Sequence, residues 1–241
     1  MPCILHIETS TRACSAGVSL NGKMLAIRDS LDMEYSHSSR LTVFIDEVIR
    51  EAGLKPADVD AVAVSSGPGS YTGLRIGVST AKGFCYALDI PLIAVDTMKA
   101  LARVAMDKLS TKKDILPATA IQTLFCPMID ARRMEVYNAV FDSRLKKVQE
   151  TRASIIDEDA FREQLKDDKI IFFGDGAAKC SSIIRSPNAL FLEDVWPSAT
   201  GMLREAESCF KNNQFADLAY FEPFYLKDFV AGKPKVKGLY A

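Results

Sequence analysis

Residues 3–28 read CILHIETSTRACSAGVSLNGKMLAIR and set the architecture of the whole chain. Two strand-like runs, 3–9 and 14–20, are joined by a short polar turn. Asn21-Gly22 is a dipeptide that favours a tight hairpin turn, and it leads into a third run at 23–28. The sequence therefore predicts a meander of three antiparallel strands at the start of the protein.

Helices and buried strands alternate after this meander. Apolar residues recur at helical spacing from Leu41 to Ala52, and Gly53 ends the pattern. The order β-β-β-α-β-α-β-α predicts an α/β domain in which helices pack on the faces of a mixed sheet. The further segments of this half are a strand at 61–64, a glycine-rich turn at 66–70, a helix at 72–88, a strand at 91–95 and a helix at 97–109.

The second half repeats this order without repeating the sequence. We therefore predict two tandem α/β domains, 1–108 and 109–241, with an exposed linker near 108–116 that contains Lys112-Lys113-Asp114 and leads to Pro117. The predicted segments are strands at 121–129 and 134–141, a weaker strand at 145–151, a helix at 157–166, a strand at 169–173, a short helix from 177, a strand at 189–192 and a helix at 198–210.

The composition indicates a globular protein of 241 residues, 48% hydrophobic and 25% charged, with a formal net charge of −1. We expect neither a membrane span nor a cleaved signal peptide. Six cysteines without a CxxC pair favour a reducing, cytoplasmic location. The net charge argues against strong general affinity for nucleic acid. The lysine-rich stretch 222–241 is expected to be a solvated tail.

Motifs for the common kinds of catalysis are missing from the sequence. Only His6 and His37 exist, and the position that would complete an HxxxH metal pair with His37 is Leu41. His6 lies within an apolar strand, which favours a hydrogen-bonded core histidine. There is neither an HExxH nor a GxSxG motif. We therefore predict no catalytic residues and no metal site in this chain.

A nucleotide site is a weaker candidate, because neither the Walker motif nor GxGxxG occurs. Three turns, at 8–11, 130–133 and 174–177, could hold a nucleotide between the domains. The first two have no glycine, which close approach of the backbone to a phosphate generally needs. The turn at 66–70 precedes a helix, so it is either a tight structural turn or an anion site. The residues considered for a nucleotide or anion are Thr9, Ser10, Ser66, Gly67, Gly69, Ser70, Asp130, Arg132, Gly174, Asp175 and Gly176.

The helix at 72–88 is the most unusual segment. Only Arg75 and Lys82 are charged between residues 71 and 88, and apolar side chains point in every direction. Gly73, Gly77 and Ala81 form a flat strip at i, i+4 and i+8, so something must approach it closely. The helix is either sandwiched within its own domain or forms a subunit interface, which we favour. The predicted partner-binding residues are Tyr71, Gly73, Leu74, Arg75, Gly77, Val78, Ala81, Lys82, Cys85 and Tyr86.

Three stretches of the chain resemble the TsaB (YeaZ) family. They are ILHIETS at 4–10, SGPGSYTGLRIG at 66–77 and IDARRMEVY at 129–137, of which the second is the most specific. The resemblance implies an actin-like ATPase (ASKHA) fold with two ribonuclease-H-like domains. It also implies a role in forming threonylcarbamoyladenosine, next to the anticodon of tRNA.

The resemblance further implies that this chain is a non-catalytic scaffold that docks and activates a catalytic paralogue, TsaD. The pair would work with a TsaE-like ATPase and bind tRNA through the complex, and the chain alone would form a homodimer. No cofactor is implied for the chain itself, whereas the complex would use a metal ion, ATP and threonylcarbamoyl-adenylate. Pairing in the family involves the helix at 72–88, so Gly77→Leu is expected to abolish pairing and to spare the fold.

Two other functions remain open. One is a nucleotide-binding ATPase or kinase of the actin-like superfamily, which nucleotide binding by the isolated chain would reveal. The other is an M22-type metallopeptidase (glycoprotease), a label used in this family by similarity to TsaD. The missing histidine pair argues against the peptidase.

Overall fold

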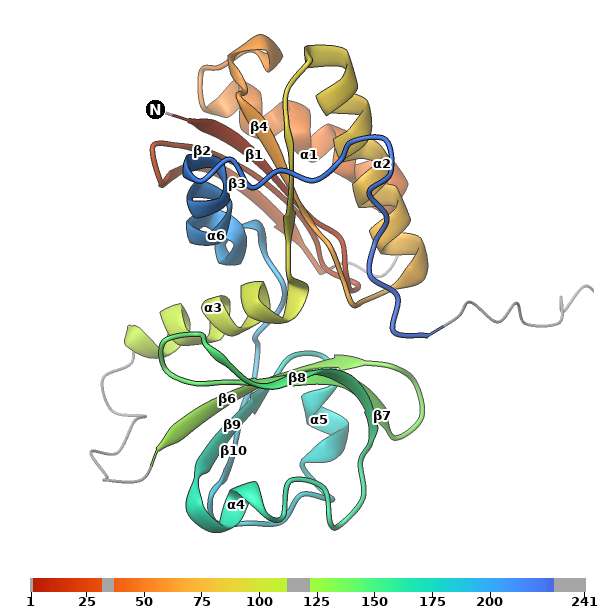
Figure 1. The fold of residues 1–241 in the computed structure, drawn as a ribbon, viewed down its shortest axis with the longest axis vertical. Coiled ribbons are helices and arrows are strands. Elements are labelled where there is room, and N and C mark those ends of the chain that lie inside the picture. The colour runs from red at the N-terminus through yellow and green to blue at the C-terminus, as the bar shows by residue number, and fades with distance from the viewer. Residues whose placement is uncertain (1, 32–36, 112–121, 228–241) are drawn as a thin grey trace, which may run out of the picture.

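A computed structural model describes residues 2–31, 37–111 and 122–227, arranged as two domains stacked along the long axis of the molecule (Figure 1). Each domain is built on a five-stranded mixed sheet. Residues 112–121, which include most of the predicted linker, and the part of the predicted tail beyond Lys227 lie outside the described residues. No helix in the described ranges is long and apolar enough to cross a bilayer.

The first sheet has the strand order β3-β2-β1-β4-β5. The predicted meander is confirmed, because β2 pairs antiparallel with both β1 and β3. Strands β4 and β5 extend the other edge in parallel with β1, as their almost wholly buried, uncharged sequences favour. The strands are β1 (Cys3–Glu8), β2 (Cys14–Leu20), β3 (Lys23–Ser30), β4 (Ala61–Ser65) and β5 (Leu92–Val95).

The second sheet has the order β10-β9-β6-β7-β8, which repeats that of the first in chain sequence. The prediction of two domains of one supersecondary order is therefore confirmed. The weak third strand is present, and it is longer than predicted. The strands are β6 (Thr123–Asp130), β7 (Glu135–Phe141), β8 (Lys147–Ile155), β9 (Lys169–Phe173) and β10 (Ala189–Leu192).

The covering helices are exchanged between the two halves of the chain. Helix α6 (Ala199–Lys211), from the second half, packs on the first sheet through Met202 and Ala206. Helix α3 (Thr97–Ser110), from the first half, joins Phe125 and Phe141 in the core of the second domain. The boundary at 108 stays a prediction, but the packing makes each half depend on a helix from the other.

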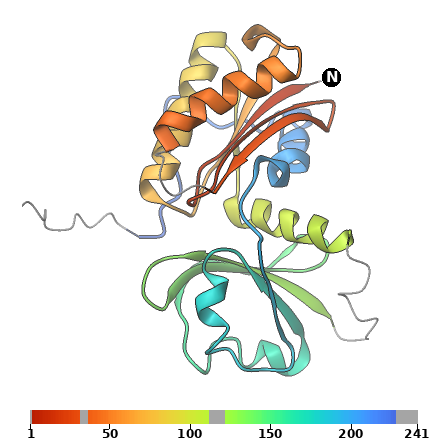
Figure 2. The ribbon, with the colours of Figure 1, turned by 180° about the vertical axis from the view of Figure 1, so that it is seen from behind.

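Two long helices cover the opposite face of the first sheet. They are α1 (His37–Glu51) and α2 (Tyr71–Leu88), which lie side by side (Figure 2). Their inner faces share one core with the sheet, in which Leu41, Ile45 and Cys85 are buried. The short helices are η1 (Pro56–Asp58), α4 (Gln164–Asp167) and α5 (Ala177–Cys180).

The helix predicted at 157–166 is wrong except for its last turn, α4. Asp157 Oδ1 accepts a hydrogen bond from Asp159 N, a local turn that competes with helix formation. Phe161 has a left-handed backbone, with φ of 62°. Its ring is buried against Phe172, with 5.1 Å between the ring centroids. Tertiary burial of Phe161 therefore overrides the helical pattern.

His6 is the core histidine that the sequence predicts. Its side chain is fully buried in β1, and Nε2 is 2.8 Å from Ser19 Oγ. Burial lowers the pKa of His6 from 6.5 to about 3. The neutral imidazole is therefore part of the folded state.

This burial predicts acid sensitivity. Below pH 6.5 the imidazole of His6 binds a proton in the unfolded state and stays neutral in the folded state. The free energy of unfolding therefore falls as pH drops from 6.5 towards 3, by on the order of 1.4 kcal/mol per pH unit. Buried Glu8 acts in the opposite sense, since burial raises its pKa and its stability contribution is lost as pH rises. Urea unfolding of the wild type and His6→Gln from pH 7 to 4 isolates the histidine. Equal pH slopes for the two proteins would contradict this assignment.

Candidate functional site

Hydrogen bonds at the turn before α2 attach this helix to the first hairpin. Ser70 caps α2, with its Oγ accepting from Gly73 N at 3.3 Å. Ser70 N donates to Ser10 O at 2.6 Å, and Thr9 Oγ1 donates to Gly73 O at 2.8 Å. The start of α2 is therefore bound to the end of β1, at the edge of the sheet that faces the second domain.

The glycine strip of α2 faces its own domain. A Cβ added at Gly73 would collide with Thr9 O, and one added at Gly77 would collide with Thr9 Oγ1. Ala81 is fully buried on the same core. The prediction that this strip admits a partner is therefore wrong, because the first hairpin already fills the space. The same holds for Leu74, Val78 and Cys85, which are buried in their own domain.

The outward face of α2 is a different set of residues, Thr72, Arg75, Ser79, Gly83 and Tyr86, which we call the outer face. They recur every three or four positions and are all exposed. Nothing lies within 4 Å of a Cβ built at Gly83, and Tyr86 is 84% exposed. Of the residues predicted for partner binding, Arg75 and Tyr86 lie on this face, with Tyr71 and Lys82 partly exposed beside it.

Sequence reasoning missed Thr72, Ser79 and Gly83. Their signal was the same helical spacing as that of the buried strip, but the sequence does not say which strip faces inward. Beside the outer face, a cavity of about 310 Å³ lies where α1 and α2 meet. It is lined by Thr42, Ile45, Asp46, Ile49, Arg50, Leu54, Lys55, Pro56 and Phe84.

A segment from the end of the chain lies along the other side of α2. Residues 216–227, which we call the C-terminal strap, return to the first domain after α6 (Figure 1). Ala216 N donates to Leu92 O at 2.8 Å, and Phe224 N donates to Ser66 O at 2.7 Å. Lys82 Nζ donates to Ala219 O at 3.1 Å, so this lysine holds the strap. The strap fixes one flank of α2 and leaves the outer face open.

The candidate anion site in the first domain is filled by the chain itself. Ser66, Gly67, Gly69 and Ser70 lie against Thr9 and Ser10. A Cβ at Gly69 would collide with Ser10 O, and one at Gly67 would collide with Phe224 O. Thr9 and Ser10 are fully buried. The structure thus favours the tight structural turn over an anion site.

The candidate turns of the second domain also bind each other. Asp175 Oδ1 accepts from Asp130 N at 3.1 Å. Lys179 Nζ forms an ion pair with the Asp130 carboxylate and donates to the carbonyl oxygens of Arg133 and Glu135, each at 2.7 Å. The ammonium group of Lys179 therefore binds one carboxylate and two carbonyl oxygens at this turn.

Gly174 and Gly176 have a packing role. A Cβ at either glycine would press on the backbone of β6, at Met128 O and at the Ile129 carbonyl carbon respectively. Burial raises the pKa of Asp175, and the positive charge of Arg12 in the first domain opposes this rise. Within the described residues, no group of three or more His, Cys, Asp and Glu side chains is placed to hold a metal ion. Both expectations, no metal and no nucleotide in this chain, stay predictions.

Two domains with the same sheet order, each completed by a helix from the other half, define a protein of the actin-like ATPase fold class. A family model described as "TsaD: tRNA N6-adenosine threonylcarbamoyltransferase" matches residues 32–233. The chain belongs to this family, within which its relatives are TsaB (YeaZ) proteins.

Two of these relatives match over almost their whole length. The tRNA threonylcarbamoyladenosine biosynthesis protein TsaB of Haemophilus influenzae is 27% identical over 95% of both chains. The protein of the same name from Escherichia coli strain K12 is 29% identical over 95% of this chain and 96% of its own. The solved structure of YeaZ from Pseudomonas aeruginosa superposes with a TM-score of 0.77 at 24% identity, and the match covers 94% of this chain and 100% of that one. The predicted family and fold are confirmed.

Proposed function

We propose that this chain is a non-catalytic subunit required for threonylcarbamoyl transfer to N6 of the adenosine next to the anticodon in tRNA. It acts by docking a TsaD-like catalytic subunit and stabilising the active conformation of that subunit. The names of the full-length relatives support the pathway. A tRNA substrate also favours the cytoplasmic location expected from the cysteines.

The observation that carries the docking role is the outer face of α2. This helix is buried on one side by its own domain and held on a flank by the strap, yet it exposes Tyr86 beside an uncovered Gly83. An exposed glycine lets a partner helix approach the backbone closely, and a buried tyrosine contributes an area of about 150–250 Å². The docking face is therefore the outer face, in place of the buried strip that the sequence suggested.

The non-catalytic role is supported by the core of the first domain. Leu41, at the position where an HxxxH pair would have its second histidine, is fully buried against the sheet. A side chain at this position packs in the core, whereas a metal ligand needs an open coordination position for substrate. In this proposal the catalytic subunit holds the metal ion and the threonylcarbamoyl-adenylate, and the TsaE-like subunit uses ATP.

Calorimetric titration of the chain with its TsaD-like subunit tests the docking role. We expect a one-to-one complex that competes with a homodimer of the isolated chain, because both use the outer face. Titration with ATP serves as the control for the rival kinase or ATPase function. Tight ATP binding without any binding of the TsaD-like subunit would overturn the proposal.

A further inference from the structure

A cavity of about 390 Å³ opens in the second domain, at the end of β8. All of its lining residues fall within 152–161, which is the end of this edge strand and the loop that follows it. The loop returns to the sheet at Phe161, which has a left-handed backbone and a ring buried against Phe172. A bulky residue in this conformation is strained, and strained residues cluster at binding sites. The cavity is separate from α2 and from the turns of the first domain.

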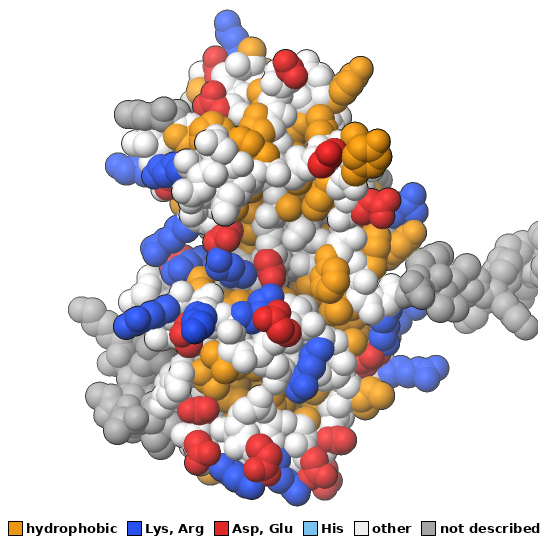
Figure 3. All heavy atoms as spheres, viewed as in Figure 1, with side chains coloured by type: hydrophobic (Ala, Val, Ile, Leu, Met, Phe, Trp, Pro, Cys, Tyr) orange, Lys and Arg blue, Asp and Glu red, His pale blue; other side chains and the backbone are white. Residues whose placement is uncertain are grey.

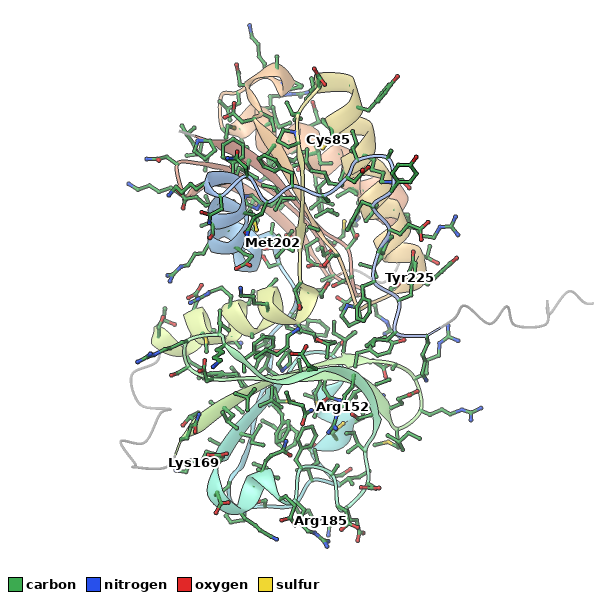
Figure 4. The ribbon with its side chains drawn as sticks, in the orientation of Figure 1. Cys85, Arg152, Lys169, Arg185, Met202 and Tyr225 are labelled. Atoms are coloured by element: carbon green, nitrogen blue, oxygen red, sulfur yellow. The ribbon has the colours of Figure 1, made fainter. Side chains whose placement is uncertain are left out.

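Arg152 supplies the positive charge of this cavity. Its Cα is paired with that of Asn138 on β7, so the two side chains leave the same face of the sheet. The side chain of Arg152 lies over the middle of the second domain (Figure 4). Burial raises the pKa of the Cys126 thiol, and the charge of Arg152 opposes this rise. Arg152 takes part in none of the ion pairs that the described residues form, so its charge has no counter-ion there.

A row of amides beside Arg152 is incompletely hydrogen-bonded. One polar atom of the Gln149 side chain lies 2.8 Å from Gln164 Nε2. The other polar atom of this side chain lies 3.1 Å from Arg152 Nε and 3.3 Å from Asn138 Oδ1. Asn138 is fully buried, and its Nδ2 has no partner in the described part of the chain. Buried polar atoms are costly without a partner, so a further hydrogen-bonding group is expected at this place.

The other lining residues restrict the kind of anion that fits. Asp157 and Asp159 line the same cavity, and Asp159 is neutralised by Arg162 at 2.6 Å. Asp157 pairs with no cation in the described ranges, so its charge repels a ligand with several negative charges. The buried side chains of Ile156 and Phe161 give the cavity an apolar wall, which suits the body of an organic molecule. One arginine, one unpaired acid and an apolar wall favour a monocarboxylate over a phosphate or a nucleotide.

We propose that this cavity is a binding site for a small organic acid with one carboxylate group, which Arg152 holds. The guanidinium group donates two parallel hydrogen bonds to the carboxylate, the arrangement that these two groups favour. The hydroxyl group of Ser154, which also lines the cavity, donates to the same ligand. The apolar body of the ligand packs on Phe161. The site goes beyond the docking role, because none of its residues lies on the outer face of α2.

A small molecule suits this place better than a second protein does. Acidic and basic side chains are interspersed at the end of the second domain far from the first, without a broad apolar patch (Figure 3). Protein interfaces have an apolar centre, whereas small-molecule sites are cavities with a few polar groups and a volume of about 300–1,000 Å³. The cavity at the end of β8 has such a volume.

NMR titration of the full chain tests the site, with benzoate as the probe. We expect benzoate to shift the backbone amide signals of residues 152–161, with a dissociation constant on the order of 1 mM for one charge-assisted contact in an open cavity. Benzamide has the same shape without the charge and should bind at least about tenfold more weakly. Phthalate, which carries two carboxylates, should also bind more weakly than benzoate, because Asp157 repels the second charge.

Three variants locate the binding of benzoate. Arg152→Gln should weaken it about tenfold or more. Asp157→Asn removes a negative charge and keeps the oxygen that accepts from Asp159 N, so it should strengthen binding about two- to threefold. Arg185→Gln is the matched control and should change nothing. Arg185 is an exposed arginine at the far end of the second domain, outside the cavity (Figure 4).

The proposal is overturned if benzoate shifts no signal within residues 152–161, or if benzamide binds as tightly. Unchanged binding by Arg152→Gln, or an equal loss in Arg185→Gln, would contradict it as well. A thermal melt of each variant shows whether the fold is intact. If Arg152→Gln does not fold, Arg152→Lys takes its place: it keeps the charge without the fork of parallel donors and should bind benzoate more weakly than the wild type.

Discussion

Gly83→Leu abolishes binding of the TsaD-like subunit and leaves the fold of the chain intact; this is the result we expect. The added side chain projects from the outer face into space that is open in this structure. In the proposed complex a partner helix would fill the same space, so we expect binding to weaken about 100-fold or more. Leucine also favours a helix over glycine by about 1 kcal/mol, so the melting temperature should not fall.

Calorimetric titration and a thermal melt of the same preparation measure both parts of this prediction. Gly83→Ala is the graded control, since a methyl group should cost much less binding than a leucine side chain. Ser208→Leu places the same bulk on the exposed side of α6, which covers the other face of the sheet, and should leave binding unchanged. Unweakened binding by Gly83→Leu would show that the outer face is not the docking site.

Gly77→Leu has the opposite expected result, a severe loss of stability. A Cβ at this position collides with Thr9 Oγ1, whose hydroxyl also donates to Gly73 O. The leucine would force α2 away from β1 and disrupt the core beneath it. We expect a loss of at least about 3 kcal/mol, or roughly 6–12 °C in melting temperature for a chain of this size.

Urea unfolding of Gly77→Leu and wild type measures this loss, and Gly77→Ala should give a smaller one. Thr9→Gly removes the colliding hydroxyl. Adding Gly77→Ala to Thr9→Gly should therefore cost less stability than adding it to the wild type. A native melting temperature for Gly77→Leu would contradict the packing of the buried strip. It would also restore the expectation from the sequence that this variant separates pairing from folding.

Much of the fold was predictable because local chemistry and tertiary structure agree. Asn21-Gly22 specifies the hairpin between β2 and β3, and Asn21 and Gly22 both adopt left-handed backbones there. The repeat of one element order in both halves indicated two domains of one kind. The helix at 157–166 was mispredicted because burial of Phe161 decides the backbone at this point, and a helical pattern does not reveal such a contact.

The sequence predicts the candidate docking site only to the level of the helix. The sequence showed that α2 is apolar all round, but both Gly77 and Gly83 fit a close-packed strip. Only the position of Thr9, 68 residues before Gly77, decides which glycine is buried. The strap could not be predicted for the same reason, because the hydrogen bond from Lys82 to Ala219 joins residues 137 positions apart. The exchange of α3 and α6 likewise depends on contacts between distant segments.

The central claim, that this chain activates a catalytic partner, is tested most directly by reconstitution. Threonylcarbamoyladenosine in tRNA is measured with the TsaD-like subunit, the TsaE-like ATPase and threonylcarbamoyl-adenylate, in the presence and absence of this chain. The account predicts product only when the chain is present, none from the chain alone, and a loss of product with Gly83→Leu. Equal product with and without the chain would contradict it.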